Sequence, residues 1–158
     1  MKRNSWQEYQ KEVADDRYYY LRSCIRQNFF PGSEKAFVRI LRQELGRDLF
    51  DDPVHTSCTG IGYHSDIVPL ETIMTVVARQ FALASEAGYE NLAVSCITSF
   101  GIYTEILETW QGFPELEAKV REHLFRATGR EFRKPKNVSH ASDIIFHHRE
   151  AIRQRAAY

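Results

Sequence analysis

The chain has 158 residues, 43% of them hydrophobic and 27% charged, which is the size and composition of one globular domain. Its 21 basic and 21 acidic side chains balance, so no basic field favours nucleic acid, and no apolar run approaches the roughly 18 residues of a membrane span. The N-terminus lacks the apolar segment of a secretory signal. We therefore expect a cytoplasmic protein whose three cysteines stay reduced unless a metal or sulfide takes them.

The first part of the domain predicts a strand, a helix and a second strand. Residues 18–23 are aromatic and aliphatic, as is typical of a buried strand. Pro31 and the glycine after it predict a turn, and Ser33 is the expected N-cap of a helix whose apolar side chains recur at helical spacing. Gly46 is expected to end this helix. A short strand is then expected around Val54.

The second part alternates helices and strands. The longest helix is expected to begin near Ser65 or Asp66 and to end at Gly88, with Pro69 in its first turn. The elements expected after it are a buried strand over 91–96, a helix over 100–110, a helix over 114–127, a strand over 133–140 and a final helix over 141–158.

This alternation predicts an α/β fold, in which a small, about four-stranded parallel sheet is flanked by helices on both faces. The domain is expected over residues 18–146. A polar arm or short helix over residues 1–17 would precede it, and a charged helical extension over residues 147–158 would follow it.

The three cysteines share one position relative to the predicted strands. Cys24, Cys58 and Cys96 each follow the end of a strand, and His140 follows the end of the fourth. The carboxyl ends of parallel strands lie along one edge of a sheet, where open α/β proteins bind their ligands. We therefore expect the thiols at the C-terminal edge of the sheet, with His140 and His64 as further candidate ligands.

Thiols at this edge suit a metal cluster or sulfur transfer. Each cysteine also precedes a predicted helix, whose free amides and positive dipole end would lower thiol pKa values and stabilise an anionic cluster. The Cys-x-x-Cys pairs of structural zinc sites are absent, so these separated thiols favour an iron–sulfur cluster or a sulfur-transfer site. The alternative is that each cysteine is a small buried apolar residue.

The cysteine spacing also forms a recognisable series. Cys24 is followed after 33 residues by Cys58-Thr59-Gly60, and after 37 more by Cys96-Ile97-Thr98-Ser99. Over about residues 18–146 the chain resembles the cysteine-rich CCG domain found in the B subunit of heterodisulfide reductase and in its relatives. In that family a first cysteine, a Cys-Cys-Gly and a Cys-x-x-Cys follow one another across long gaps.

This chain departs from the family pattern at two positions. Thr59 stands at the second cysteine of the Cys-Cys pair, and Ser99 at the last cysteine of the Cys-x-x-Cys. Family members with the full set use five cysteines to hold a noncubane cluster that cleaves the disulfide of coenzymes M and B. The resemblance implies that three cysteines could instead hold one [4Fe-4S] cube, its fourth iron open or capped by His64, His140, Asp66 or a partner residue.

The sequence therefore predicts an iron–sulfur subunit for electron transfer or thiol/disulfide redox chemistry, with Cys24, Cys58 and Cys96 as the cluster ligands. It would be an oxidoreductase component acting on a sulfur group. The resemblance implies partners, either other redox subunits or a second copy of the chain. Two alternatives stay open: a scaffold subunit that has lost its cluster, and a sulfur-transfer protein with a persulfide on one cysteine.

Overall fold

The structure of the chain is a computed structural model that describes residues 13, 17–54, 58 and 60–156. The expected arm over residues 1–17 therefore lies almost wholly outside the described residues. In chain order the elements are β1 (Arg17–Leu21), α2 (Cys24–Phe29), α3 (Pro31–Arg39), the π-helical turn η2 (Ile40–Glu44), β2 (Asp48–Asp51), α4 (Gly60–His64), α5 (Leu70–Glu86), β3 (Asn91–Val94), α6 (Ile97–Gly112), α7 (Pro114–Thr128), β4 (Asn137–His140), α8 (Ala141–His147) and α9 (Arg149–Arg155).

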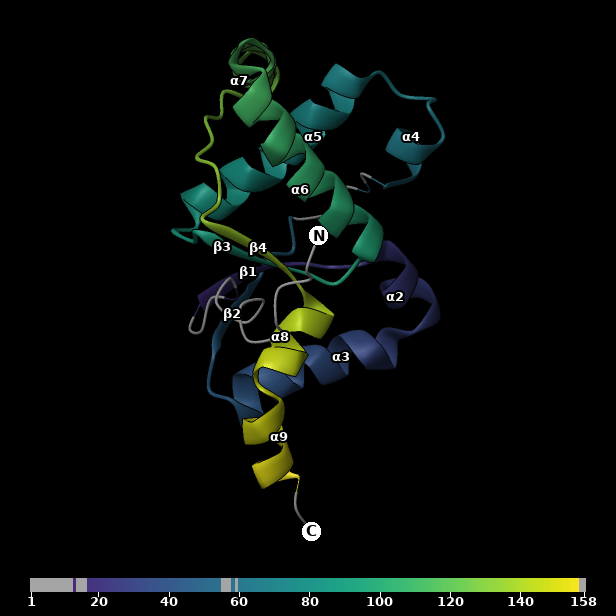
Figure 1. Cartoon of the computed structure of the whole chain (residues 1–158), viewed down its shortest axis with the longest axis vertical. Helices are drawn as coiled ribbons and strands as arrows, with labels where there is room; N and C mark the ends of the chain where they lie inside the picture. The colour runs from purple at the N-terminus through teal and green to yellow at the C-terminus, as the bar shows by residue number, and fades with distance from the viewer. Residues whose placement is uncertain (1–12, 14–16, 55–57, 59, 157–158) are drawn as a thin grey trace, which may run out of the picture.

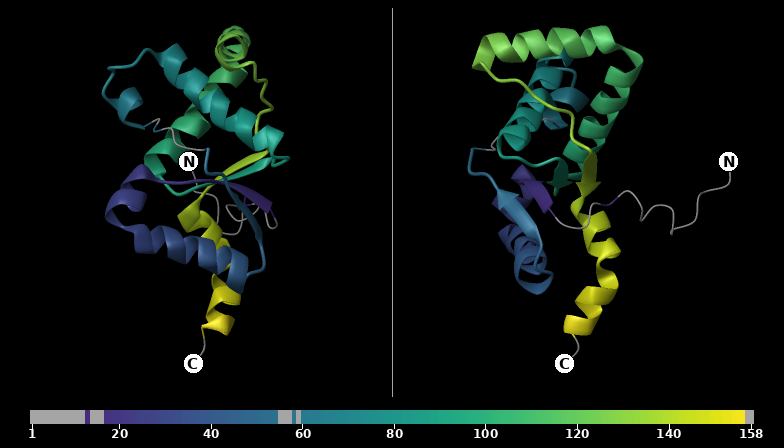
Figure 2. Two further views of the ribbon diagram at one scale, coloured as in Figure 1. Left: turned by 180° about the vertical axis from the view of Figure 1, so that it is seen from behind. Right: turned by 90° about the vertical axis from the view of Figure 1, so that its left-hand side faces the viewer.

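Four strands form one parallel sheet in the order β2-β1-β3-β4, which confirms the predicted fold class. Helices α5, α6 and α7 lie on one face of this sheet, and α3 and α8 lie on the other (Figures 1 and 2). The central strands β1 and β3 are buried on both faces, which explains why their sequences are apolar without alternation.

Successive residues of β1 point into two separate cores. Tyr19 and Leu21 pack under α5 and α6, whereas Tyr18 and Tyr20 pack against α3 and α8. The larger core includes the Trp110 ring of α6, which packs against other aromatic rings with centroids 5.3 and 6.2 Å away. This packing fixes α6, and so it also fixes the turn by which β3 enters α6.

Two helix starts differ from the sequence prediction. Helix α3 begins at Pro31 itself, because a proline ring suits the first helical position, and the Ser33 hydroxyl donates to the Phe30 carbonyl (2.8 Å) instead of capping. Helix α5 begins at Leu70 with Pro69 at its N-cap position. Asp66 lies outside that helix with a φ of 54°, a left-handed conformation that aspartate tolerates.

Three further elements were placed differently by the sequence pattern. The second strand, β2, ends before Val54 rather than lying around it, and residues 24–29 form a helix that the sequence pattern did not predict. The C-terminal helix is interrupted at His148, which separates α8 from α9. Among the helices that the structure describes, none is long and apolar enough to cross a membrane.

Candidate functional site: the cysteine edge

The cysteine edge, defined by Cys24, Cys58 and Cys96, lies beyond the carboxyl ends of the strands. Cys24 opens α2, three residues after β1, and Cys96 is the N-cap of α6, two residues after β3. The amide of Ser95 donates to the carbonyl of Leu21 (3.0 Å), so pairing between these two chain segments continues past both strands. Cys58 comes seven residues after β2.

The structure brings two of the thiols into direct contact. The sulfur atoms of Cys24 and Cys58 are 4.0 Å apart, and both residues are exposed. Cys96 is only partly exposed. Although Cys24 is exposed, partial desolvation of its thiol raises the pKa of this group, and the neighbouring thiolates of Cys58 and Cys96 raise it further, so both lie within electrostatic range of Cys24.

The first turn of α6 surrounds the third thiol with hydrogen-bond donors. Burial acts to raise the pKa of the Cys96 thiol, but the amide and hydroxyl of Ser99, the amide of Thr98 and the hydroxyl of Ser23 outweigh it. The pKa of Cys96 therefore lies below the ordinary value of a thiol. The expected effect of helix amides holds for Cys96, whereas the pKa of Cys24 moves in the opposite direction.

Ser23 was not anticipated from the sequence. It is buried, and its hydroxyl accepts a hydrogen bond from the amide of Arg26 (3.3 Å), which makes it the N-cap of α2. The same hydroxyl acts on the thiol of Cys96. A serine directly before a cysteine at a strand exit is the sequence signal that could have indicated this link.

The two candidate histidines have different surroundings. His140 ends β4 and is mostly buried, and its Nδ1 accepts from the amide of Ser142 (3.3 Å), so it caps α8. Burial lowers the pKa of His140, because desolvation disfavours the imidazolium. His64 is the exposed last residue of α4, with its ring against Tyr63. Within the described part of the chain, no group of three or more His, Cys, Asp or Glu side chains is arranged to hold a metal ion.

Close packing joins the segment after Cys58 to the turn after Cys96. Gly60, the first residue of α4, is buried, and a Cβ added there would lie 2.6 Å from Cγ2 of Thr98. Only glycine leaves room for this approach. The glycine thus lets the Cys58 segment lie directly against the helix turn whose amides act on the Cys96 thiol.

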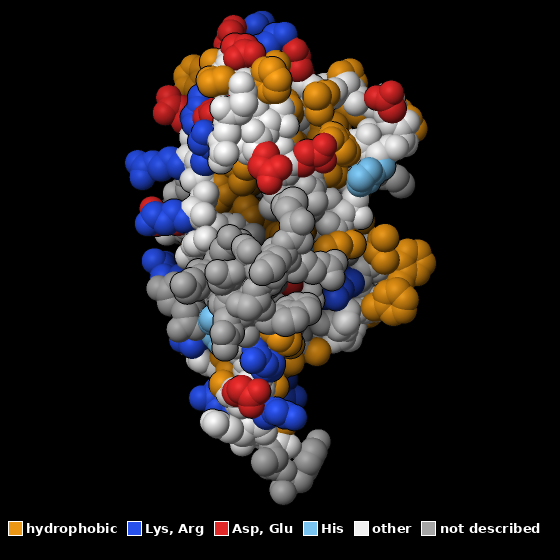
Figure 3. All heavy atoms as spheres, in the orientation of Figure 1, with side chains coloured by type: hydrophobic (Ala, Val, Ile, Leu, Met, Phe, Trp, Pro, Cys, Tyr) orange, Lys and Arg blue, Asp and Glu red, His pale blue; other side chains and the backbone are white. Residues whose placement is uncertain are grey.

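An apolar rim borders the cysteine edge. Ile25, Phe29 and Phe30 follow Cys24 in α2 and at its end, and Phe29 is 74% exposed. Figure 3 shows hydrophobic side chains gathered where α2 projects, at the right of the view. Ile97, directly after Cys96, is also exposed. Exposed apolar residues that cluster together are typical of a protein contact surface.

Fold and site together define a parallel α/β domain with a thiol-bearing carboxyl edge. The chain is 26% identical over 156 residues to the B subunit of the ferredoxin:CoB-CoM heterodisulfide reductase of Methanosarcina acetivorans, a match that covers 94% of this chain and 49% of that protein. The chain thus spans about half the length of this curated relative. No family model matches the chain.

A solved structure shows the same fold. The crystal structure of a hypothetical protein from Helicobacter pylori superposes with a TM-score of 0.63 at 15% sequence identity. The match covers 92% of this chain and 31% of that one, so it supports the α/β architecture and no particular activity.

Proposed function

We propose that the chain is a redox subunit that binds an iron–sulfur cluster through Cys24, Cys58 and Cys96. The observation that carries the proposal is the contact between the thiols of Cys24 and Cys58, which come from segments 34 residues apart, at the edge that also receives Cys96. The sequence similarity to one component of a heterodisulfide reductase supports a redox role for this edge.

The chemistry of the donor set fits such a cluster. Iron–sulfur clusters are held by thiolates, and hydrogen bonds to the sulfur atoms stabilise their negative charge and tune their potential. The turn after Cys96 provides such donors from the Thr98 and Ser99 amides, and the Ser23 hydroxyl adds another. When bound, a cluster would supply one-electron transfer, and the cysteines would hold it in place.

The partner in this proposal is another component of a redox complex. The relative in Methanosarcina acetivorans is named as one subunit of a reductase. In this chain the apolar side chains of Ile25, Phe29 and Ile97 border the cysteine edge, so a partner that covers them would also reach the thiols. Phe29→Ser is expected to weaken association with such a partner. A pull-down that uses this chain as bait and purified subunits of a redox complex from the same organism as prey tests this expectation.

A second candidate function is thiol/disulfide exchange without a cluster. The 4.0 Å between the Cys24 and Cys58 sulfur atoms favours it, since a small movement would allow a bond between them. Oxidation would join the two sulfur atoms. The two protons and two electrons that they lose would reduce the disulfide of a partner to two thiols. Cys96 would then remain a thiol.

The two candidates are separated by iron and sulfide analysis of anaerobically purified and reconstituted protein. The first predicts iron and acid-labile sulfide in equal amounts, with a visible absorption that is lost in Cys24→Ala, Cys58→Ala and Cys96→Ala. Ser33→Ala, a change at an exposed position of the nearby helix α3, serves as the control and keeps the cluster.

The second candidate predicts colourless protein and a reversible loss of two thiols on oxidation. Mass spectrometry would locate the bond between Cys24 and Cys58, and Cys96→Ala would leave this bond intact. Colourless protein that forms no disulfide would contradict both candidates and leave the scaffold alternative.

A further inference from the structure

A cavity of about 480 Å³ lies beside β1 and β2, on the face of the sheet that α3 covers. This volume is in the range of small-molecule sites. None of the three cysteines lines it, so it is separate from the cysteine edge. Its lining includes Tyr20, Arg22, Glu34, Lys35, Val38 and Arg42.

One face of a continuous helix forms the outer wall. Glu34, Lys35 and Val38 lie on α3, and Arg42 lies in the π-helical turn η2 that extends it. The amide of Leu45 donates to the carbonyl of Ile40 (2.9 Å), five residues earlier, which is the hydrogen bond of a π-helix. Such turns are frequent at functional sites, because the extra residue redirects the side chains after it.

Arg42 is held in place by a backbone carbonyl of β2. Its Nε and Nη2 both donate to the carbonyl of Leu49 in β2, at 2.9 and 2.6 Å. In the described part of the chain, neither Arg42 nor Lys35 forms an ion pair with a carboxylate. The charge of Arg42 does act through space on Asp48, but that carboxylate already pairs with Arg17. A guanidinium fixed in this way keeps further N–H donors for an anion and loses little entropy on binding one.

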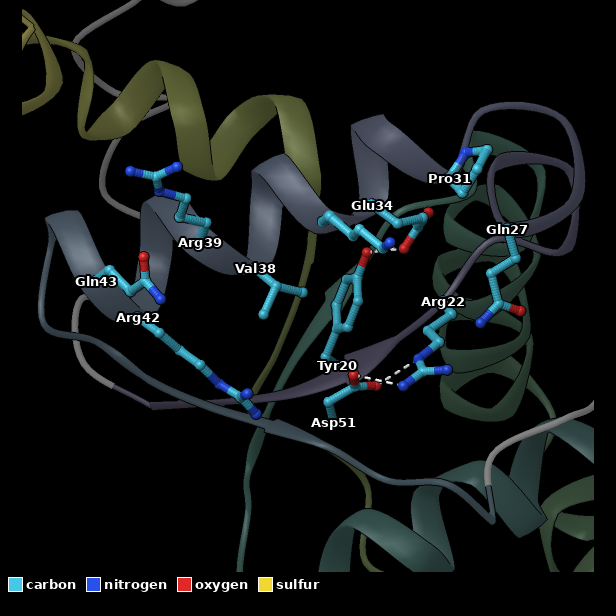
Figure 4. Close-up of a pocket in the computed structure, with 11 residues that line it drawn as sticks. Tyr20, Arg22, Gln27, Pro31, Glu34, Val38, Arg39, Arg42, Gln43 and Asp51 are labelled. Carbon is cyan, nitrogen blue, oxygen red and sulfur yellow. Dashed lines mark hydrogen bonds and ion pairs between the residues drawn. The ribbon is translucent and has the colours of Figure 1, made fainter.

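The opposite end of the cavity is closed by polar groups that are already paired. Arg22 donates to both carboxylate oxygens of Asp51 at 2.5 Å, so its charge is balanced. Glu34 is mostly buried, and its carboxylate accepts from the hydroxyls of Tyr20 and Ser95. Figure 4 shows Val38 between Arg42 on one side and Tyr20 with Glu34 on the other.

We propose that this cavity binds a small organic anion with a carboxylate or phosphate group. The acid group lies at Arg42, which Figure 4 shows on the far side of Val38 from the carboxylate of Glu34, a group that would repel it. The body of the ligand packs on the apolar wall that Val38 and Pro31 provide. Charge and shape thus point to the same orientation of the ligand.

Isothermal titration calorimetry with benzoate and phenyl phosphate tests this site at constant ionic strength. Both probes carry an acid group and an apolar ring, and the one that binds more tightly identifies the preferred acid. Arg42→Gln is expected to weaken binding about tenfold or more, because a charge-assisted hydrogen bond is lost. Val38→Phe is expected to weaken binding by narrowing the cavity at its apolar wall while leaving Arg42 in place.

Arg126→Gln is the matched control, since Arg126 is an exposed arginine of α7 that does not line the cavity. It should bind both probes as the unchanged protein does. The proposal is overturned if neither probe binds the unchanged protein at roughly 10 mM, a concentration that would nearly saturate a site with a Kd of about 1 mM. An unchanged affinity in Val38→Phe would also overturn it, even if Arg42→Gln fails to fold.

Discussion

Replacing Gly60 by alanine would test whether the segment after Cys58 packs against the first turn of α6. The new Cβ would lie 2.6 Å from Cγ2 and 3.2 Å from Cβ of Thr98, so the threonine or the glycine segment must move. Overpacking of this kind costs about 1–3 kcal/mol. Gly60 is the first residue of α4, where the helix propensity of alanine contributes little, so the expected net loss in the free energy of unfolding stays at about 1–3 kcal/mol.

Urea denaturation measures this loss, and Gly101→Ala is the matched control. Gly101 lies within α6, and a Cβ there meets nothing within 4 Å, so this change should stabilise the protein by about 0.5–1 kcal/mol. In a Thr98→Ser background, which lacks Cγ2, the cost of Gly60→Ala should fall by about 1 kcal/mol. An equal cost in both backgrounds would refute the packing argument, as would a Gly60→Ala variant as stable as the unchanged protein.

Three further outcomes are expected. Tyr20→Phe removes one of the two hydroxyl donors to the buried Glu34 and should lower the free energy of unfolding by about 1–3 kcal/mol in urea denaturation. Because burial lowers the pKa of His140 in the folded state, the unfolded chain binds more protons, so stability should fall as the pH drops below about 6.5; His140→Asn should reduce this dependence in thermal unfolding. In metal-free protein, the pH midpoint of iodoacetamide alkylation, followed by mass spectrometry, should be lower for Cys96 than for Cys24.

Each of these outcomes has a result that would contradict it. Tyr63→Phe removes an exposed hydrogen bond to Glu105 and should change stability by less than about 0.5 kcal/mol, so an equal loss in both tyrosine variants would rule out a special role of the buried pair. An unchanged pH dependence in His140→Asn would assign that dependence to other groups. A lower alkylation midpoint at Cys24 would mean that the amides of α6 do not act on Cys96.

The order of the strands and helices was predictable because long-range burial dominates it. The apolar run in β3 and the helical spacing in α5 are signals that tertiary packing reinforces, so these elements formed where the pattern indicated. Helix starts were less predictable, since Pro31 and Pro69 both lie at or beside a helix start, where serine and aspartate had been expected to cap.

The contacts around the cysteine edge could not be predicted from the sequence alone. Spacing alone placed Cys24 and Cys96 after strands, but the hydrogen bonding of Ser23 to both α2 and the Cys96 thiol depends on how two strand exits lie side by side. The buried Glu34 had no sequence signal either, because its partners Tyr20 and Ser95 are 14 and 61 residues away.

The contact between Arg42 and the carbonyl of Leu49 has a consequence for self-association. Strand β2 is at the edge of the sheet, and edge strands with free backbone groups can pair with a strand of another molecule and seed aggregates. Arg42 occupies one of these backbone acceptors. Asp48 and Asp51, at the two ends of the strand, form ion pairs with Arg17 and Arg22. An incoming strand would have to desolvate these charged groups, so this short edge is protected against polymerisation by the side chains around it.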